Sequence, residues 1–252
     1  LSVALIQGNI AQDLKWREDR VQTTLTAYRD LIAASDANLV VLPETALPLF
    51  LHSVPREYLE SLAAHAHKTG GDILLGVPER GDARTYYNTV LSLGSAPEQF
   101  YRKSHLVPFG EFVPPGFRWF VEQMRIPLGD FERGKDPAPI HTVAGRLIGF
   151  NICYEDLFPE AIAWQVQQGA HVLVNASNLA WFGDSHALHQ HLQISRMRSL
   201  ELQRPMLRAT NTGMTAVVDH TGRVVQALPP FSRGILHGEV EGQTGLTPYA
   251  YW

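Results

Sequence analysis

Three side chains that could carry out acyl-transfer chemistry, Glu44, Lys103 and Cys153, each come directly after a short segment with the pattern of a β-strand. Open α/β sheets bind ligands at the carboxyl ends of their strands. Because each of the three residues follows a strand, we expect their side chains to converge in one crevice.

Each residue type has a function in acyl transfer. A thiol attacks a carbonyl as its thiolate, a carboxylate can take and return the proton, and an ammonium group can stabilise both the thiolate and an oxyanion. Taken singly, Glu44 could begin a helix, Lys103 could be an exposed charge and Cys153 could fill the core. The three together favour a catalytic interpretation.

The elements that must position these residues alternate between short runs rich in β-branched residues and longer amphipathic stretches. This alternation predicts an α/β protein. Pro43 ends the strand before Glu44, and Pro159 opens a helix that Gly169 closes. Strands are expected at residues 3–7, 38–42, 73–77, 87–93, 99–102, 146–151, 171–175, 206–210 and 215–219, and helices at residues 16–34, 56–68, 159–169 and 186–202.

Composition narrows the class of protein. The 252 residues are 45% hydrophobic and 18% charged, which suits one compact domain. The net charge of -4 and the lack of a dense Lys/Arg run argue against nucleic acid as a partner. A single cysteine excludes an internal disulfide and a thiolate zinc cluster. No apolar run approaches the roughly 20 residues of a membrane span, so the chain by itself is expected to be soluble.

Three segments resemble the signatures of the nitrilase superfamily, and their order along the chain agrees as well. They are residues 42–45 (LPET), 101–111 (YRKSHLVPFGE) and 149–155 (GFNICYE). The resemblance implies a four-layer α-β-β-α sandwich. It also implies that Cys153 is the nucleophile, Glu44 the general base and Lys103 the group that stabilises the oxyanion.

The same resemblance extends to residues beside the trio. Glu111 matches a fourth active-site position, from which it would orient Lys103 or support the base. Tyr154 and Glu155 flank the nucleophile, and the resemblance implies that they shape the oxyanion hole.

Further segments resemble the apolipoprotein N-acyltransferases, a bacterial branch of this superfamily that completes lipoprotein maturation. They are residues 178–185 (NLAWFGDS), 189–191 (HQH), 196–198 (RMR), Glu201 and 208–213 (RATNTG). Leu179 departs from the branch, which often has Asp there. The resemblance implies that residues 1–252 form a single nitrilase-like catalytic domain, the periplasmic part of a larger protein of the bacterial inner membrane.

Membership of this branch would also define the reaction and its partners. A fatty acyl chain would pass from a phospholipid to a thioester on Cys153, and then to the N-terminal amine of a diacylglyceryl-cysteine lipoprotein. No cofactor is implied. The missing membrane-spanning part would bring the domain to the membrane surface.

Residues 107–139 are rich in proline and aromatic residues, which is typical of a long functional loop. Trp119 and Phe120 within it, together with Trp181 and Phe182, are the expected contacts of the lipid. Alternatively, the loop folds back and caps the core.

Other functions stay open. A soluble amidase or carbamoylase of the same superfamily would use the same trio with water as the acceptor, and a catalytically silent interaction module would leave Cys153 unreactive. His186, His189 and His191 invite a metal hypothesis, but the spacing of known zinc helices is lacking, so no metal is expected. A last group is expected to form structural ion pairs rather than to bind phosphate: Arg196, Arg198, Arg204 and Arg208.

Overall fold

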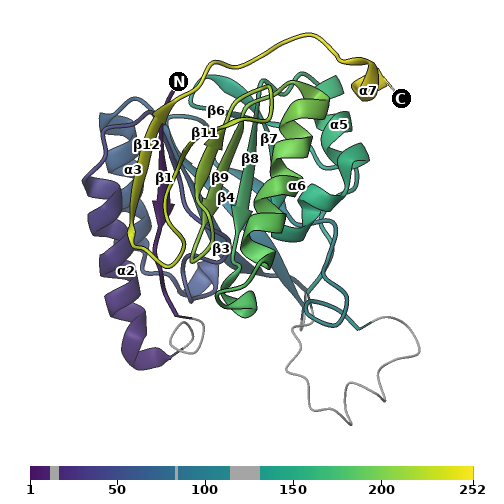
Figure 1. Cartoon of the computed structure of the whole chain (residues 1–252). Coiled ribbons are helices and arrows are strands. Elements are labelled where there is room, and N and C mark those ends of the chain that lie inside the picture. The colour runs from purple at the N-terminus through teal and green to yellow at the C-terminus, as the bar shows by residue number, and fades with distance from the viewer. Residues whose placement is uncertain (12–16, 83–84, 114–130, 252) are drawn as a thin grey trace.

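The first of two sheets is built around three parallel strands near the start of the chain. The computed structural model describes residues 1–11, 17–82, 85–113 and 131–251. Strands β1 to β3 are parallel, and antiparallel strands extend this sheet on both sides (Figure 1). In order across the sheet, the strands are β12 (Gly234–Glu239), β1 (Ser2–Gln7), β2 (Leu39–Val41), β3 (Asp72–Arg80), β4 (Tyr86–Gly94) and β5 (Gln99–Arg102).

The second sheet also has six strands and a parallel centre. Strands β7, β8 and β9 are parallel, while β6, β10 and β11 pair antiparallel at its sides. In order, the strands are β11 (Val224–Ala227), β10 (Ala216–Val218), β9 (Met206–Thr210), β8 (Val172–Ser177), β7 (Arg146–Ile152) and β6 (His141–Val143).

The two sheets pack face to face, and helices cover their outer faces (Figure 1). Helices α2 (Glu18–Ala33) and α3 (Arg56–Lys68) lie on the first sheet, and α5 (Pro159–Gln167) and α6 (Ala187–Leu202) lie on the second. Short α7 (Pro248–Tyr251) contacts α5 and α6. This arrangement confirms the expected α-β-β-α sandwich.

Apolar side chains on both faces of the central strands form the core. In β1, Val3 and Leu5 point into the space between the sheets, whereas Ala4 and Ile6 pack against the helices. All four are at most 1% exposed. Because both faces are buried, the strand appears in the sequence as a continuous apolar run rather than an alternation.

The expected strands and helices are confirmed, with ends that differ by a few residues. Strands β6, β11 and β12 were not expected. Three of the four residues of β11 are exposed, and β12 pairs with β1 from the far end of the chain. No helix in the described ranges combines the length and the apolar character that crossing a bilayer requires.

Gly76 in β3 positions the segment that carries Glu44. After β2, the backbone N–H of Leu42 donates to the Leu74 carbonyl (2.8 Å), and the N–H of Leu47 donates to the Gly76 carbonyl (3.3 Å). A Cβ atom at Gly76 would lie 2.1 Å from the Pro43 carbonyl oxygen. Since no real Cβ approaches an oxygen so closely, only glycine allows this segment to lie on the strand.

We therefore expect Gly76→Ala to lower the free energy of unfolding by about 1–3 kcal/mol, as overpacking does. The change should also displace Glu44. Urea denaturation measures the loss. The matched control is Gly234→Ala in β12, where the nearest heavy atom would lie 3.8 Å from the new Cβ. Equal losses in the two variants would show that the close approach does not matter.

Candidate active site

The Lys103 ammonium lies between two carboxylates. Its Nζ is 2.9 Å from Glu111 Oε1 and 3.3 Å from Glu44 Oε1. The side chain is 1% exposed, and those of Glu44 and Glu111 are 8% and 12% exposed. A buried charge is costly unless it is paired. Here one ammonium group pairs with both carboxylates, so the expected convergence of Glu44 and Lys103 and the expected link from Glu111 to Lys103 are present.

Asn88 of β4 holds both carboxylates. Its Nδ2 donates to Glu44 Oε1 (2.6 Å) and to Glu111 Oε1 (3.0 Å). The backbone N–H of Asn178 donates to Glu44 Oε2 (2.8 Å), and that of Val107 donates to Glu111 Oε2 (2.8 Å). Sequence reasoning missed Asn88. The available signal was an amide within a predicted strand, because an amide that is buried there needs hydrogen-bond partners.

The local structure sets Lys103 in place. Its backbone N–H donates to the Asn88 carbonyl (2.9 Å), and its carbonyl accepts from the N–H of Gly134 (2.8 Å). Burial opposes the charged form, but the attraction of Glu44 and Glu111 outweighs it, and the net result is a pKa of Lys103 above its usual range. The ammonium group is therefore charged throughout the physiological pH range.

Cys153 follows β7 as the first residue of a short 3₁₀ helix, η2 (Cys153–Leu157), and is partly buried. Its φ of 51° lies in the left-handed region, which a non-glycine residue adopts only at a cost. Burial first, and the Glu44 charge second, raise the pKa of the thiol, whereas Lys103 lowers it. The thiol is thus protonated at neutral pH and needs a base at the moment of attack.

Glu155 links the Cys153 segment to the Lys103 segment. Its Oε1 accepts from the backbone N–H groups of Ser104 (2.7 Å) and His105 (3.0 Å) and from the Ser104 hydroxyl (3.0 Å). Its Oε2 accepts from the Ile152 N–H (2.7 Å) and the Tyr101 hydroxyl (2.8 Å). The carboxylate therefore ties the end of β5 to the end of β7. The expected role of Glu155 in shaping the oxyanion hole stays a prediction.

Tyr154 packs in an aromatic group beside the nucleophile. Its ring meets Phe158 edge-on with centroids 5.3 Å apart, and Phe158 stacks on His105 at 4.0 Å. Through Phe158, these contacts link Tyr154 to His105, two residues after Lys103. The expected role of Tyr154 in shaping the oxyanion hole stays a prediction.

Trp181 and Phe182 are exposed beside the site. They belong to a 3₁₀ helix, η3 (Ala180–Phe182), just after Asn178, and are 72% and 54% exposed. Leu157 of η2 is also exposed, at 43%. We call these three residues the apolar rim. The other two expected lipid contacts, Trp119 and Phe120, lie outside the described residues.

The four arginines divide into two kinds. Arg198 pairs with Glu201 (2.8 Å) and Arg208 with Asp156 (3.5 Å), as expected of structural ion pairs. Arg196 and Arg204 instead donate to backbone carbonyls through their Nε atoms, both at 2.7 Å. Within the described ranges, no three His, Cys, Asp or Glu side chains are grouped so that they could hold a metal ion.

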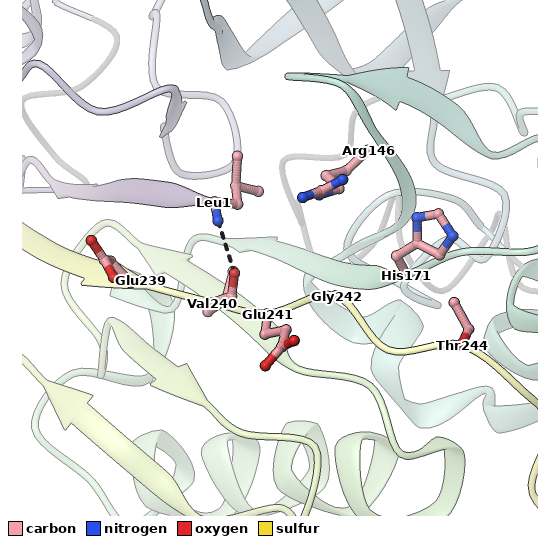
Figure 2. A pocket seen from close by; sticks show the side chains of 8 residues that line it. All are labelled: Leu1, Arg146, His171, Glu239, Val240, Glu241, Gly242 and Thr244. Carbon is pink, nitrogen blue, oxygen red and sulfur yellow. Dashed lines mark hydrogen bonds between the residues drawn. The ribbon is translucent and has the colours of Figure 1, made fainter.

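A pocket of about 580 Å³ opens at the opposite end of the strands (Figure 2). Leu1 precedes β1 in its wall, Arg146 begins β7 and Glu239 ends the antiparallel strand β12. The trio, in contrast, follows the carboxyl ends of β2, β5 and β7. None of the expected site residues lines this pocket.

The arrangement can therefore support nucleophilic acyl transfer. Two carboxylates and an ammonium group come from the ends of strands of the first sheet or the segment after them, and the thiol comes from the second sheet. A thiol that stays protonated, next to a carboxylate and a fixed cation, has both a proton acceptor and a partner for a developing oxyanion. These groups and the four-layer sandwich define an enzyme class, the nitrilase superfamily.

The sequence pattern of the family described as carbon-nitrogen hydrolase matches residues 2–249. The chain belongs to the carbon-nitrogen hydrolase family. An amidase from Nesterenkonia sp. AN1, described as carrying acrylamide at its active-site cysteine, has the same fold. It superposes with a TM-score of 0.71 at 20% identity, over 96% of this chain and 93% of the amidase.

Two curated relatives are much closer in sequence. The apolipoprotein N-acyltransferase of Nitrosomonas europaea is 49% identical over 99% of this chain, and that of Ralstonia nicotianae is 48% identical over 99%. The aligned regions cover 50% and 49% of those proteins. The chain thus spans about half the length of the relatives it matches.

We expect Glu155→Gln to lower both the free energy of unfolding and the reactivity of Cys153, because an amide NH₂ would replace an oxygen that accepts hydrogen bonds. Loss of a buried partner of this kind costs about 1–3 kcal/mol of unfolding free energy. Chemical denaturation and the rate of Cys153 alkylation measure the two effects. Exposed Glu160→Gln on α5 is the control. If Glu155→Gln kept the stability and thiol reactivity of Glu160→Gln, the link between the two segments would be unimportant.

Proposed function

We propose that this chain is the catalytic domain of an apolipoprotein N-acyltransferase. It would move a fatty acyl chain from a phospholipid through a Cys153 thioester to the N-terminal amine of a diacylglyceryl-cysteine lipoprotein. The observation that carries the proposal is the grouping of Glu44, Lys103 and the thiol at one end of the two sheets. The names of the 48–49% identical relatives support the choice of donor and acceptor.

In the first step, the Cys153 sulfur bonds to the ester carbonyl carbon of the phospholipid, and the thiol proton passes to Glu44. Lys103 stabilises the oxyanion. When the oxyanion collapses, the carbon–oxygen bond of the ester breaks and Glu44 returns the proton to the lysophospholipid alkoxide. The raised pKa of the thiol supports this role of Glu44, because proton removal must accompany attack.

In the second step, the lipoprotein amine attacks the thioester carbon and Glu44 takes a proton from the nitrogen. The carbon–sulfur bond then breaks, and the sulfur regains a proton as the amide leaves. Lys103, which is held by Glu44 and Glu111, would serve both oxyanions from one position. Two half-reactions at one thiol predict ping-pong kinetics.

The apolar rim supports a lipid as the acyl donor. Trp181, Phe182 and Leu157 present large apolar side chains to solvent beside a polar site, and such exposed groups mark interaction surfaces. We infer that the rim meets acyl chains at the periplasmic face of the bacterial inner membrane.

An amidase is the alternative, because the amidase from Nesterenkonia shares the fold. It would use the same thioester chemistry with water in place of the amine. The acceptor therefore distinguishes the two functions, and a thioester that persists in water favours acyl transfer to an amine.

Incubation with phosphatidylethanolamine or phosphatidylglycerol should produce an acyl adduct on Cys153 that hydroxylamine removes. Intact-mass spectrometry measures the adduct. Cys153→Ser should give no hydroxylamine-sensitive adduct, and Lys103→Met should slow acylation by about a hundredfold or more, because it removes the oxyanion partner.

The same assay separates the alternatives. Hydrolysis of small amides without any lipid adduct would favour the amidase. If Lys103→Met acylated at the wild-type rate, its assignment to the oxyanion would be wrong.

We expect the double replacement Trp181→Ser and Phe182→Ser to slow acylation by long-chain phospholipid at least tenfold more than acylation by a short activated ester, because the rim would bind only the long chain. The comparison of the two acylation rates measures this selectivity. Tyr251→Ser is the control, since Tyr251 is equally exposed (73%) but lies on α7, away from the site (Figure 1). Equal losses with both donors would exclude a role of the rim in lipid binding.

A further inference from the structure

A ladder of three polar side chains crosses the parallel strands behind the nucleophile. Asn151 of β7, Asn175 of β8 and Arg208 of β9 are paired neighbours in the sheet register. They are at most 2% exposed. Residues on either side of each in its strand belong to the core between the sheets, so the ladder lies on the face that α6 covers.

Burial of the Arg208 charge within this ladder has a cost in folding free energy. It is completely buried, and its Nη1 donates to Asn175 Oδ1 (2.8 Å) and to the Ser195 hydroxyl of α6 (2.8 Å). Its carboxylate neighbour is Asp156 at 3.5 Å. Within the described part of the chain, its Nε and Nη2 have no hydrogen-bond partner. Such a charge is poor for stability compared with an apolar residue of similar size.

The ladder reaches the nucleophile through Asn175. Because a guanidinium group only donates, its bond to Asn175 fixes which end of the amide is the oxygen. The Ser177 hydroxyl donates to the same oxygen (2.6 Å). The Asn175 Nδ2 must then point away from Arg208, where it donates to Asn151 Oδ1 and to the backbone carbonyl of Cys153 (3.2 Å).

We propose that Arg208 is a positioning residue that acts through Asn175 to hold the Cys153 backbone in its left-handed conformation. That conformation sets the direction in which the Cys153 side chain leaves the backbone, and therefore the position of the thiol. The inference rests on the proposed role of Cys153 as the nucleophile, but not on the identity of the acyl donor or acceptor.

Two further observations agree with this assignment. The strained φ of 51° at Cys153 requires surroundings that hold it, and the bond from Asn175 acts on the carbonyl of that residue. In addition, burial raises the pKa of the Cys153 thiol and the charges of Glu44 and Asp156 raise it further, and the Arg208 guanidinium group lies 3.5 Å from the Asp156 carboxylate.

The test is the rate at which iodoacetamide alkylates Cys153, followed by intact-mass spectrometry of the full chain. Cys153 is the single cysteine, so the signal belongs to one site. We expect Asn175→Leu and Arg208→Met each to slow alkylation of the folded protein about tenfold, as the loss of one buried hydrogen bond would. Arg208→Lys should recover part of the rate.

Because the two residues act in series, the double variant Arg208→Met/Asn175→Leu should be no slower than the slower single variant. Ser177→Ala is the control: it removes a hydrogen bond to the same Asn175 oxygen but leaves the donor to Cys153, and it should keep the rate within about twofold.

The proposal is overturned if Asn175→Leu is alkylated at the wild-type rate, or if the losses of the two single variants add. Thermal unfolding confirms that each variant is folded at the assay temperature. If Arg208→Met does not fold, Arg208→Lys takes its place, and a wild-type rate in Asn175→Leu still overturns the proposal. A wild-type chain that forms no acyl adduct would refute the proposed function and leave this outcome unaffected.

Discussion

The burial of one ammonium group between two carboxylates constrains the rest of the site. Lys103 is almost fully covered, and its charge is tolerated because Glu44 and Glu111 both lie within 3.3 Å. These carboxylates need donors of their own, which Asn88 and two backbone N–H groups provide. Glu44 reaches this cluster from the segment after β2, and Lys103 and Glu111 reach it from residues 101–111, so none of the three can shift without weakening the pairing of a buried charge.

The nucleophile joins this cluster from the other sheet, so the core between the sheets sets the geometry of the site. Leu5 and Leu74 of the first sheet and Phe150 and Val174 of the second belong to one buried cluster, in which interior packing leaves little freedom. Glu155 adds a polar connection where the strands end. Apolar packing thus fixes the separation of the sheets, and hydrogen bonds fix the side chains.

Much of the fold and of the trio could be predicted because both depend on local patterns. A strand that ends at Pro43 or just before Cys153 is visible in the sequence. The role of Glu155 was not visible in the sequence, because the five groups that donate to it come from residues up to 54 positions away. Strand β12 was missed because it is defined by pairing with β1 rather than by its own composition. Arg208 appeared only as an ion-pair partner, since its bond to Asn175 depends on the order of the strands.

The hydrogen bond from the Asn178 N–H to Glu44 has a consequence for substrate recognition. The same short segment carries Trp181 and Phe182, three and four residues further on, so the exposed aromatic side chains and a donor to the general base belong to one piece of backbone. Binding at the aromatic side chains and the integrity of that hydrogen bond are thermodynamically linked. If a ligand binds more tightly when this hydrogen bond is formed, then ligand binding raises the equilibrium constant for forming the hydrogen bond by the same factor.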